Sequence, residues 1–199
     1  MDQSKRGLFY VIKGEPLSRT QCPATAIEKE EMAEVPYASH CYVDACFDTD
    51  PDDSRSQSGY VFKVNGGAVT WKSCKQPVVA QSTMEAEYVA AAEAANEAVW
   101  LRKFVKQLGV FPSARDPMAV LCDNTGAIAN AKEPRNHSTA KHILRRFHVI
   151  RDYVKKRRIK ICKVRTDLNV ADPLTKPLPQ AKHDQHQESM GVRLLPNVN

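Results

Sequence analysis

The segment that most constrains the fold is QSTMEAEYVAAAEAANEAVWLRKFVKQLGV, residues 81–110. Ser82, followed by Glu85 three residues later, forms a capping box and predicts the start of a helix. Seven alanines between positions 86 and 98 give high helix propensity and a thin side that can pack closely on a sheet. The residues expected to face the core, at steps of three and four, are Tyr88, Ala92, Ala95 and Val99. An apolar edge is expected to continue through the last turns of the helix, formed by Trp100, Phe104 and Leu108.

Short apolar segments on both sides of this helix predict a sheet. Asn65-Gly66-Gly67 joins two β-rich runs and is a strong hairpin signal. The remaining elements alternate in a βαβ-like order, which favours an α/β fold with a mixed sheet of five strands and helices on its faces. The expected strands are residues 41–47, the two halves of 60–73, 117–122 and 159–164, with a basic helix over 137–157 and a final short helix beginning in 169–178.

The composition limits the other possibilities. A chain of 199 residues with 42% hydrophobic residues can build one ordinary core. It has neither a signal peptide nor an apolar run long enough to cross a bilayer, so no membrane association is expected. The six cysteines lack CxxC pairing, which favours reduced thiols in an intracellular protein, cytoplasmic or nuclear, over a structural zinc site.

The predicted domain is residues 41–178. Residues 1–40 contain three prolines and no clear period, so we expect a loosely structured leader. Residues 179–199 are expected to form a polar C-terminal tail that frays.

Positive charge is concentrated in one segment. Residues 132–165 contain thirteen Lys and Arg against Glu133 and Asp152, a local net charge of +11, so the rest of the chain carries −5 of the total of +6. This asymmetry points to a polyanionic partner. The side chains that we expect to contact phosphates are Arg145, Arg146, Lys155 and Lys156.

Four carboxylates are candidates for chemistry: Asp44 inside a strand, Glu87 in the first turns of the long helix, Asp123 at a strand end, and Asp172 at a helix start. Acids within apolar strands are costly unless they are paired or bind a metal. Oxygen-rich clusters hold Mg²⁺ or Mn²⁺, and two such ions about 3.5–4 Å apart can cleave a phosphodiester.

Each acid also has a structural interpretation. Glu85 is a lesser alternative to Glu87, because the capping role assigned to Glu85 leaves Glu87 free to face the strands. Asp172 precedes a proline, a common helix N-cap arrangement, and the capping and catalytic roles are compatible. Asp123 could be a turn acid, although Asn124 could cap the next helix instead. Asp44 could be an acid hydrogen-bonded at a sheet edge.

Five motifs in order carry a family resemblance. They are YVDACF, SRSQSGYVFKVNGGAVTWKSCKQPVVAQSTMEAEYVAAAEAANEAVWLRKF, LCDNTGAIANAKEP, AKHILRRFHVIRDYV and VRTDLNVADPLTKPL. Over residues 41–195 or so, the chain resembles the ribonuclease H domain of copia-type retrotransposon Pol polyproteins, especially those of plants.

The resemblance implies a ribonuclease H-like fold and endonucleolytic cleavage of RNA in RNA–DNA hybrids. It places the family's catalytic and metal-binding D-E-D-D set on Asp44, Glu87, Asp123 and Asp172, with two Mg²⁺ or Mn²⁺ ions and no small-molecule cofactor. Many ribonucleases H have a histidine in the loop before the last acid, whereas VRTDLNVAD has none, which suggests slow turnover.

Residues 1–38 resemble a late piece of the reverse-transcriptase region, whose final motif PYAS occupies positions 36–39, close to the first strand of the domain. This suggests an internally deleted copy without polymerase motifs, served by a reverse transcriptase in trans. The alternatives are a catalytically silent nucleic-acid-binding remnant of a retroelement and a remnant that folds only partly.

Overall fold

The computed structural model describes residue 25 and residues 40–64, 66–108, 116–133 and 145–192. Nearly all of the predicted leader lies outside the described residues, as does the first part of the predicted basic helix. The elements in chain order are β1 (His40–Cys46), β2 (Gln57–Val64), β3 (Gly67–Lys75), α2 (Thr83–Leu108), β4 (Met118–Cys122), α3 (Thr125–Lys132), η3 (Arg145–His148), α4 (Val149–Lys155), β5 (Ile159–Lys163), η4 (Thr166–Leu168), η5 (Asp172–Leu174) and α5 (Gln180–Ser189).

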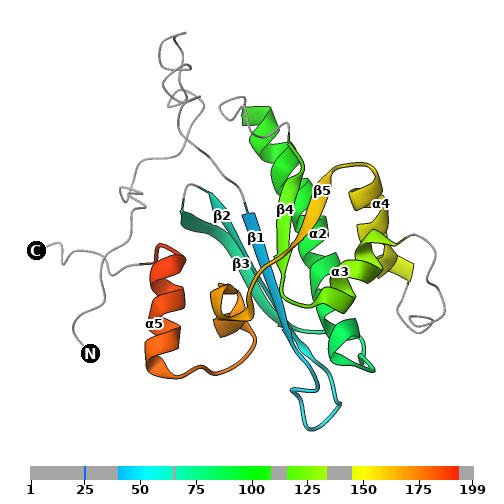
Figure 1. The fold of residues 1–199 in the computed structure, drawn as a ribbon, viewed down its shortest axis with the longest axis vertical. Coiled ribbons are helices and arrows are strands. Elements are labelled where there is room, and N and C mark those ends of the chain that lie inside the picture. The colour runs from blue at the N-terminus through cyan, green and yellow to red at the C-terminus, as the bar shows by residue number, and fades with distance from the viewer. Residues whose placement is uncertain (1–24, 26–39, 65, 109–115, 134–144, 193–199) are drawn as a thin grey trace, which may run out of the picture.

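The five strands form one sheet in the order β3-β2-β1-β4-β5. The first three strands are antiparallel neighbours, whereas β4 lies parallel to both β1 and β5. Figure 1 shows α2, α3 and α4 on one side of the sheet, and η5 and α5 on the other. The prediction of a mixed five-stranded sheet with helices on both faces is therefore confirmed.

The helix α2 begins as the capping box predicts. The Ser82 hydroxyl accepts a hydrogen bond from the Glu85 amide at 3.2 Å, and the Glu85 carboxylate accepts one from the Gln81 amide at 2.8 Å. The alanine-rich side is fully buried against the sheet, where a thin helix surface allows close approach to β1. These contacts make α2 the centre of the larger hydrophobic core.

The apolar edge predicted for the end of α2 is wrong in register. Trp100 and Phe104 are 58% and 46% exposed and stack on each other with ring centroids 5.7 Å apart. Leu101 and Val105 are buried instead. They continue the alanine side of the helix at a spacing of four residues, and this spacing selects which residues face the core.

A smaller apolar cluster covers the opposite face of the sheet. It joins Val61 of β2 to Val170 and Ala171 before η5, with Tyr42 and Met190 packed against it. Residues 180–189, assigned from sequence to a polar tail, form α5, whose His186 is buried. The sequence did not predict that α5 packs on the domain, because this helix buries the polar side chain of His186 rather than an apolar stripe. In the part of the chain that the structure describes, no helix is long and apolar enough to span a membrane.

The pairing of β1 with β4 ends before β1 does. The ladder extends from His40 and Ala119 to Tyr42 and Leu121, while β1 continues to Cys46. Beyond Tyr42, one side of β1 therefore lacks a strand partner, and side chains from both faces of the sheet can meet there. Asp44 lies in this stretch, opposite Gly59 of β2.

We predict that Gly59→Ala destabilises the domain by about 1–3 kcal/mol, the usual cost of overpacking. A Cβ at this position would lie 2.7 Å from Thr175 Cγ2 and 2.8 Å from Leu174 Cβ, so the segment that carries Asp172 would have to move. Thermal melting measures the loss. The control is Gly126→Ala, where the added Cβ would lie 2.8 Å from Met84 Cγ and 3.3 Å from Asn124 Oδ1, two side-chain atoms that can shift without moving the backbone, and where Ala favours the helix. An equal loss in both variants would contradict the close packing inferred at Gly59.

Candidate active site

Asp44 is held from two directions on the η5 side of the sheet. The residue is buried, with 1% of its surface exposed. Thr175 donates its hydroxyl hydrogen bond to Oδ2, and Asn169 Nδ2 lies 3.5 Å from Oδ1 while donating to the Val43 carbonyl at 2.9 Å. These two side chains fix the orientation of the Asp44 carboxylate.

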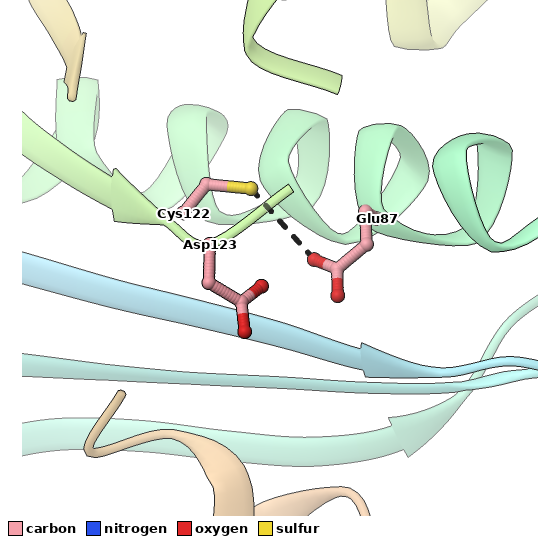
Figure 2. Close-up of side chains that lie close together, drawn as sticks. All are labelled: Glu87, Cys122 and Asp123. Carbon is pink, nitrogen blue, oxygen red and sulfur yellow. Dashed lines mark hydrogen bonds between the residues drawn. The ribbon is translucent and has the colours of Figure 1, made fainter. Parts of the chain in front are cut away.

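Glu87 reaches the same region from the opposite face. It projects from α2 toward the end of β4, where Cys122 and Asp123 lie (Figure 2). Its carboxylate accepts a hydrogen bond from the Cys122 thiol at 3.8 Å. Glu85, the alternative from sequence, is engaged in capping α2 and so cannot point to this position at the same time.

Asp123 follows the last residue of β4. The next residue, Asn124, caps α3 by accepting a hydrogen bond from the Ala127 amide at 3.0 Å. The Asp123 carboxylate is therefore not needed for capping. The Lys163 ammonium contacts the Asp123 backbone carbonyl from the end of β5 and ties the two strand ends together.

Asp172 is the first residue of η5 and is fully buried. Lys182 of α5 approaches its Oδ2 at 3.3 Å, and Lys176 approaches its Oδ1 at the same distance. Ala171 occupies the N-cap position of η5, so the prediction that Asp172 caps this helix is wrong.

The four predicted acids converge in two overlapping groups. Oxygen atoms of Asp44, Asp123 and Asp172 lie within 4.8 Å of one another, and ligand atoms of Glu87, Cys122 and Asp123 do the same. Asp123 belongs to both groups and links them. Two full negative charges 4.8 Å apart repel by about 3.5 kcal/mol at an effective dielectric constant of about 20, so the cluster requires positive charge or bound protons.

Protons supply part of this compensation. Burial, followed by the charges of Asp44 and Asp123, raises the pKa of Glu87 from 4.5 to about 9, against the lowering effects of the Ala45 amide and the Lys176 charge. Burial likewise raises the pKa of Asp44 from 3.8 to about 6, against the lowering effects of the Thr175 hydrogen bond and the Lys176 charge. At neutral pH and without metal, Glu87 is therefore protonated and Asp44 is mostly charged.

The donor set fits a hard divalent cation. It consists mainly of carboxylate oxygens, the ligands that Mg²⁺ and Mn²⁺ prefer. Asp172 Oδ1 is buried and accepts no hydrogen bond, because the Lys176 ammonium 3.3 Å away lacks hydrogen-bond geometry. A buried carboxylate oxygen without a hydrogen bond retains its capacity to coordinate an ion.

Of the predicted phosphate-binding residues, Lys155 and Lys156 are not brought together with the acids. Lys155 and Lys156 are exposed just before β5, whose first residue pairs with Met118 at the start of β4, whereas Asp123 follows the end of β4. Arg145 and Arg146 begin η3, and their side chains lie outside the described part of the chain.

Sequence reasoning missed the residues that surround the acids. They are Asn169, Thr175, Lys176 and Lys182. Lys176 had a signal, because it follows Asp172 by four residues, the spacing of a helical ion pair. Lys182 had none, since its contact depends on how α5 packs.

Curated relatives resemble this chain over most of its length. It is 40% identical over 151 residues to the retrovirus-related Pol polyprotein from transposon TNT 1-94 of Nicotiana tabacum, which covers 76% of this chain. It is 34% identical over 157 residues, 79% of this chain, to the polyprotein from transposon RE2 of Arabidopsis thaliana. The chain is a homologue of plant transposon Pol polyproteins.

This Pol homologue spans about 11% of the length of each of these two relatives. No family model matches it. Among solved structures, LC11-RNase H1 in complex with an RNA/DNA hybrid aligns with a TM-score of 0.50 at 17% identity, over 69% of this chain and 93% of that one. The Pol homologue therefore has the ribonuclease H fold, as the resemblance implied.

We predict that the metal-free Pol homologue loses stability as the pH rises from about 5 to about 9. The folded chain binds the Glu87 and Asp44 protons more tightly than the unfolded chain, because folding raises both pKa values, to about 9 and about 6. The two protons contribute fully to the free energy of unfolding when the pH is below the pKa values that these carboxyl groups have in the unfolded chain. This contribution is lost as the pH rises through their pKa values in the folded chain. Thermal melting in a chelator at several pH values measures the slope.

Glu87→Gln should flatten the part of this slope between about pH 6 and pH 9, where Glu87 loses its proton. The control is Glu188→Gln, which changes an exposed carboxylate on α5 and should keep the slope of the unmodified chain. A melting temperature that rises over this range would contradict the pKa values assigned to the cluster.

Proposed function

We propose that this chain is a metal-dependent ribonuclease that cleaves the RNA strand of RNA–DNA hybrids. In this proposal Asp44, Glu87, Asp123 and Asp172 hold two Mg²⁺ or Mn²⁺ ions. The observation that carries it is the convergence of three carboxylates within 4.8 Å at the unpaired stretch of β1, with Glu87 beside Asp123. The homology to Pol polyproteins and the ribonuclease H fold support the same reaction.

The chain's own residues prepare this site before substrate arrives. Thr175 and Asn169 orient Asp44, the Cys122 thiol donates to Glu87, and Asn124 leaves Asp123 free by capping α3. Two bound ions would activate the attacking water and stabilise the leaving oxygen. Because the supporting contacts come from different elements of the fold, the carboxylates need little reorganisation when ions bind.

We further propose that Lys155 and Lys156, with Arg145 and Arg146, contact the phosphate backbone of the hybrid. Lys155 and Lys156 lie next to the start of β5, and the acids lie past the end of β4. A five-residue strand spans about 16 Å, the length of about five base pairs of duplex. One duplex along the β4–β5 edge would reach both regions, and backbone contacts of this type do not read the sequence.

The first test is cleavage of a hybrid with either strand labelled. We expect Mg²⁺- or Mn²⁺-dependent cutting of the RNA strand only, and a loss of at least about 100-fold in Asp123→Asn because a ligand to the ions is neutralised. The matched control is Asp152→Asn, which neutralises an exposed carboxylate on α4 and should cleave normally. Hybrid binding without cleavage by the unmodified chain would identify a silent binding module, and equal cleavage by Asp123→Asn would exclude this site.

The second test is the salt dependence of hybrid binding, measured by fluorescence anisotropy in the Asp123→Asn background to prevent cleavage. The double variant Lys155→Gln/Lys156→Gln should bind more weakly and reduce the slope of log K against log[salt] by about 1–2, because fewer counterions are released. The control is Lys103→Gln/Lys106→Gln, which removes two exposed cations of α2. An unchanged slope in the first variant would remove these lysines from the interface.

A further inference from the structure

The Lys176 ammonium lies between two of the candidate metal ligands. Its Nζ is 3.4 Å from Asp44 Oδ2 and 3.3 Å from Asp172 Oδ1. The two carboxylates are 2% and 0% exposed, whereas the lysine side chain is 32% exposed. A single positive charge thus bridges two buried negative charges and still has access to solvent.

Lys182 provides an internal comparison. It approaches only Asp172, at Oδ2, from the first half of α5. In the part of the chain that the structure describes, the ion pairs of the four acids are those with Lys176 and Lys182. Lys176 alone makes a bridge that joins two of the elements of the cluster, β1 and η5.

We propose that Lys176 is an internal counter-cation that competes with divalent ions for Asp44 and Asp172, and so weakens metal binding in the absence of nucleic acid. This inference rests on the proposed function, because it takes the acid cluster as the metal site. Mg²⁺ and Mn²⁺ require carboxylate oxygens at short range, about 2.0–2.1 Å for Mg²⁺. Oxygens coordinated in this way cannot keep the same contacts with an ammonium.

The fold gives Lys176 a way to leave. The residue follows η5 and is partly exposed, so its flexible side chain can turn to solvent while Asp172 stays buried. Without metal, the ammonium offsets repulsion among Asp44, Asp123 and Asp172. With metal, the divalent charge takes over this task. Lys176 therefore stabilises the metal-free fold and opposes the first ion that binds.

The test is calorimetric titration of the full chain with MnCl₂ in the absence of nucleic acid. We expect Lys176→Gln to lower the Kd for Mn²⁺ at least about fivefold, and Lys182→Gln to lower it by less, because Lys182 contacts one carboxylate. The control is Lys106→Gln, which removes an exposed charge about 28 Å along α2 from Glu87 and should leave the Kd within about twofold. Metal-free Lys176→Gln should also melt at a lower temperature than the unmodified chain, and Mn²⁺ should raise its melting temperature by more.

An unchanged Kd in Lys176→Gln, with Mn²⁺ bound normally by the unmodified chain, would overturn the inference and leave the proposed function intact. Mn²⁺ binding by neither chain would overturn both. Binding by Lys176→Gln alone would support the inference in its strongest form. If Lys176→Gln does not fold, Lys176→Arg replaces it: a guanidinium pairs with carboxylates more strongly than an ammonium and should weaken Mn²⁺ binding. Binding as tight as that of the unmodified chain would then overturn the inference.

Discussion

The repulsion among buried carboxylates is the constraint on which the rest of this structure depends. Strand β1 continues past the point where its ladder with β4 ends, and acids from both faces of the sheet meet beside the unpaired stretch. Asp44, Glu87, Asp123 and Asp172 each come from a different element, so the cluster forms only when all of these elements are packed. The folding energy of the surrounding core therefore opposes the mutual repulsion of the acids.

Three features reduce the energetic cost of placing these carboxylates together: hydrogen bonds, a bound proton and a nearby ammonium. They differ in whether they change the net charge of the cluster. Hydrogen bonds from Thr175 and Asn169 fix the orientation of the Asp44 carboxylate without neutralising its charge. Protonation of Glu87 removes one charge at neutral pH. The Lys176 ammonium supplies a positive charge on a partly exposed side chain. In the proposed function, divalent ions would replace the proton and the ammonium, and the orienting hydrogen bonds would stay in place.

The separation of Lys155 and Lys156 from the acids follows from the direction of the parallel strands. Strand β4 begins beside the segment that carries Lys155 and Lys156 and ends at Asp123. Lys155 and Lys156, which belong to the basic segment of the sequence, thus lie at the opposite end of β4 from Asp123.

The sequence by itself determined the five strands, the long helix α2 and the candidate acids, because these depend on local chemistry, whereas α5 was missed. Ser82 and Glu85 mark the start of α2, Asn65-Gly66-Gly67 marks the hairpin, and an acid within an apolar strand marks Asp44. The role of the four acids stays a prediction. Only the tertiary structure decided which groups surround them, since Lys182 lies in a segment of polar composition with no periodic signal and reaches Asp172 through the packing of α5. Contacts between residues distant in the chain depend on which surfaces pack together, and local patterns carry little information about that choice.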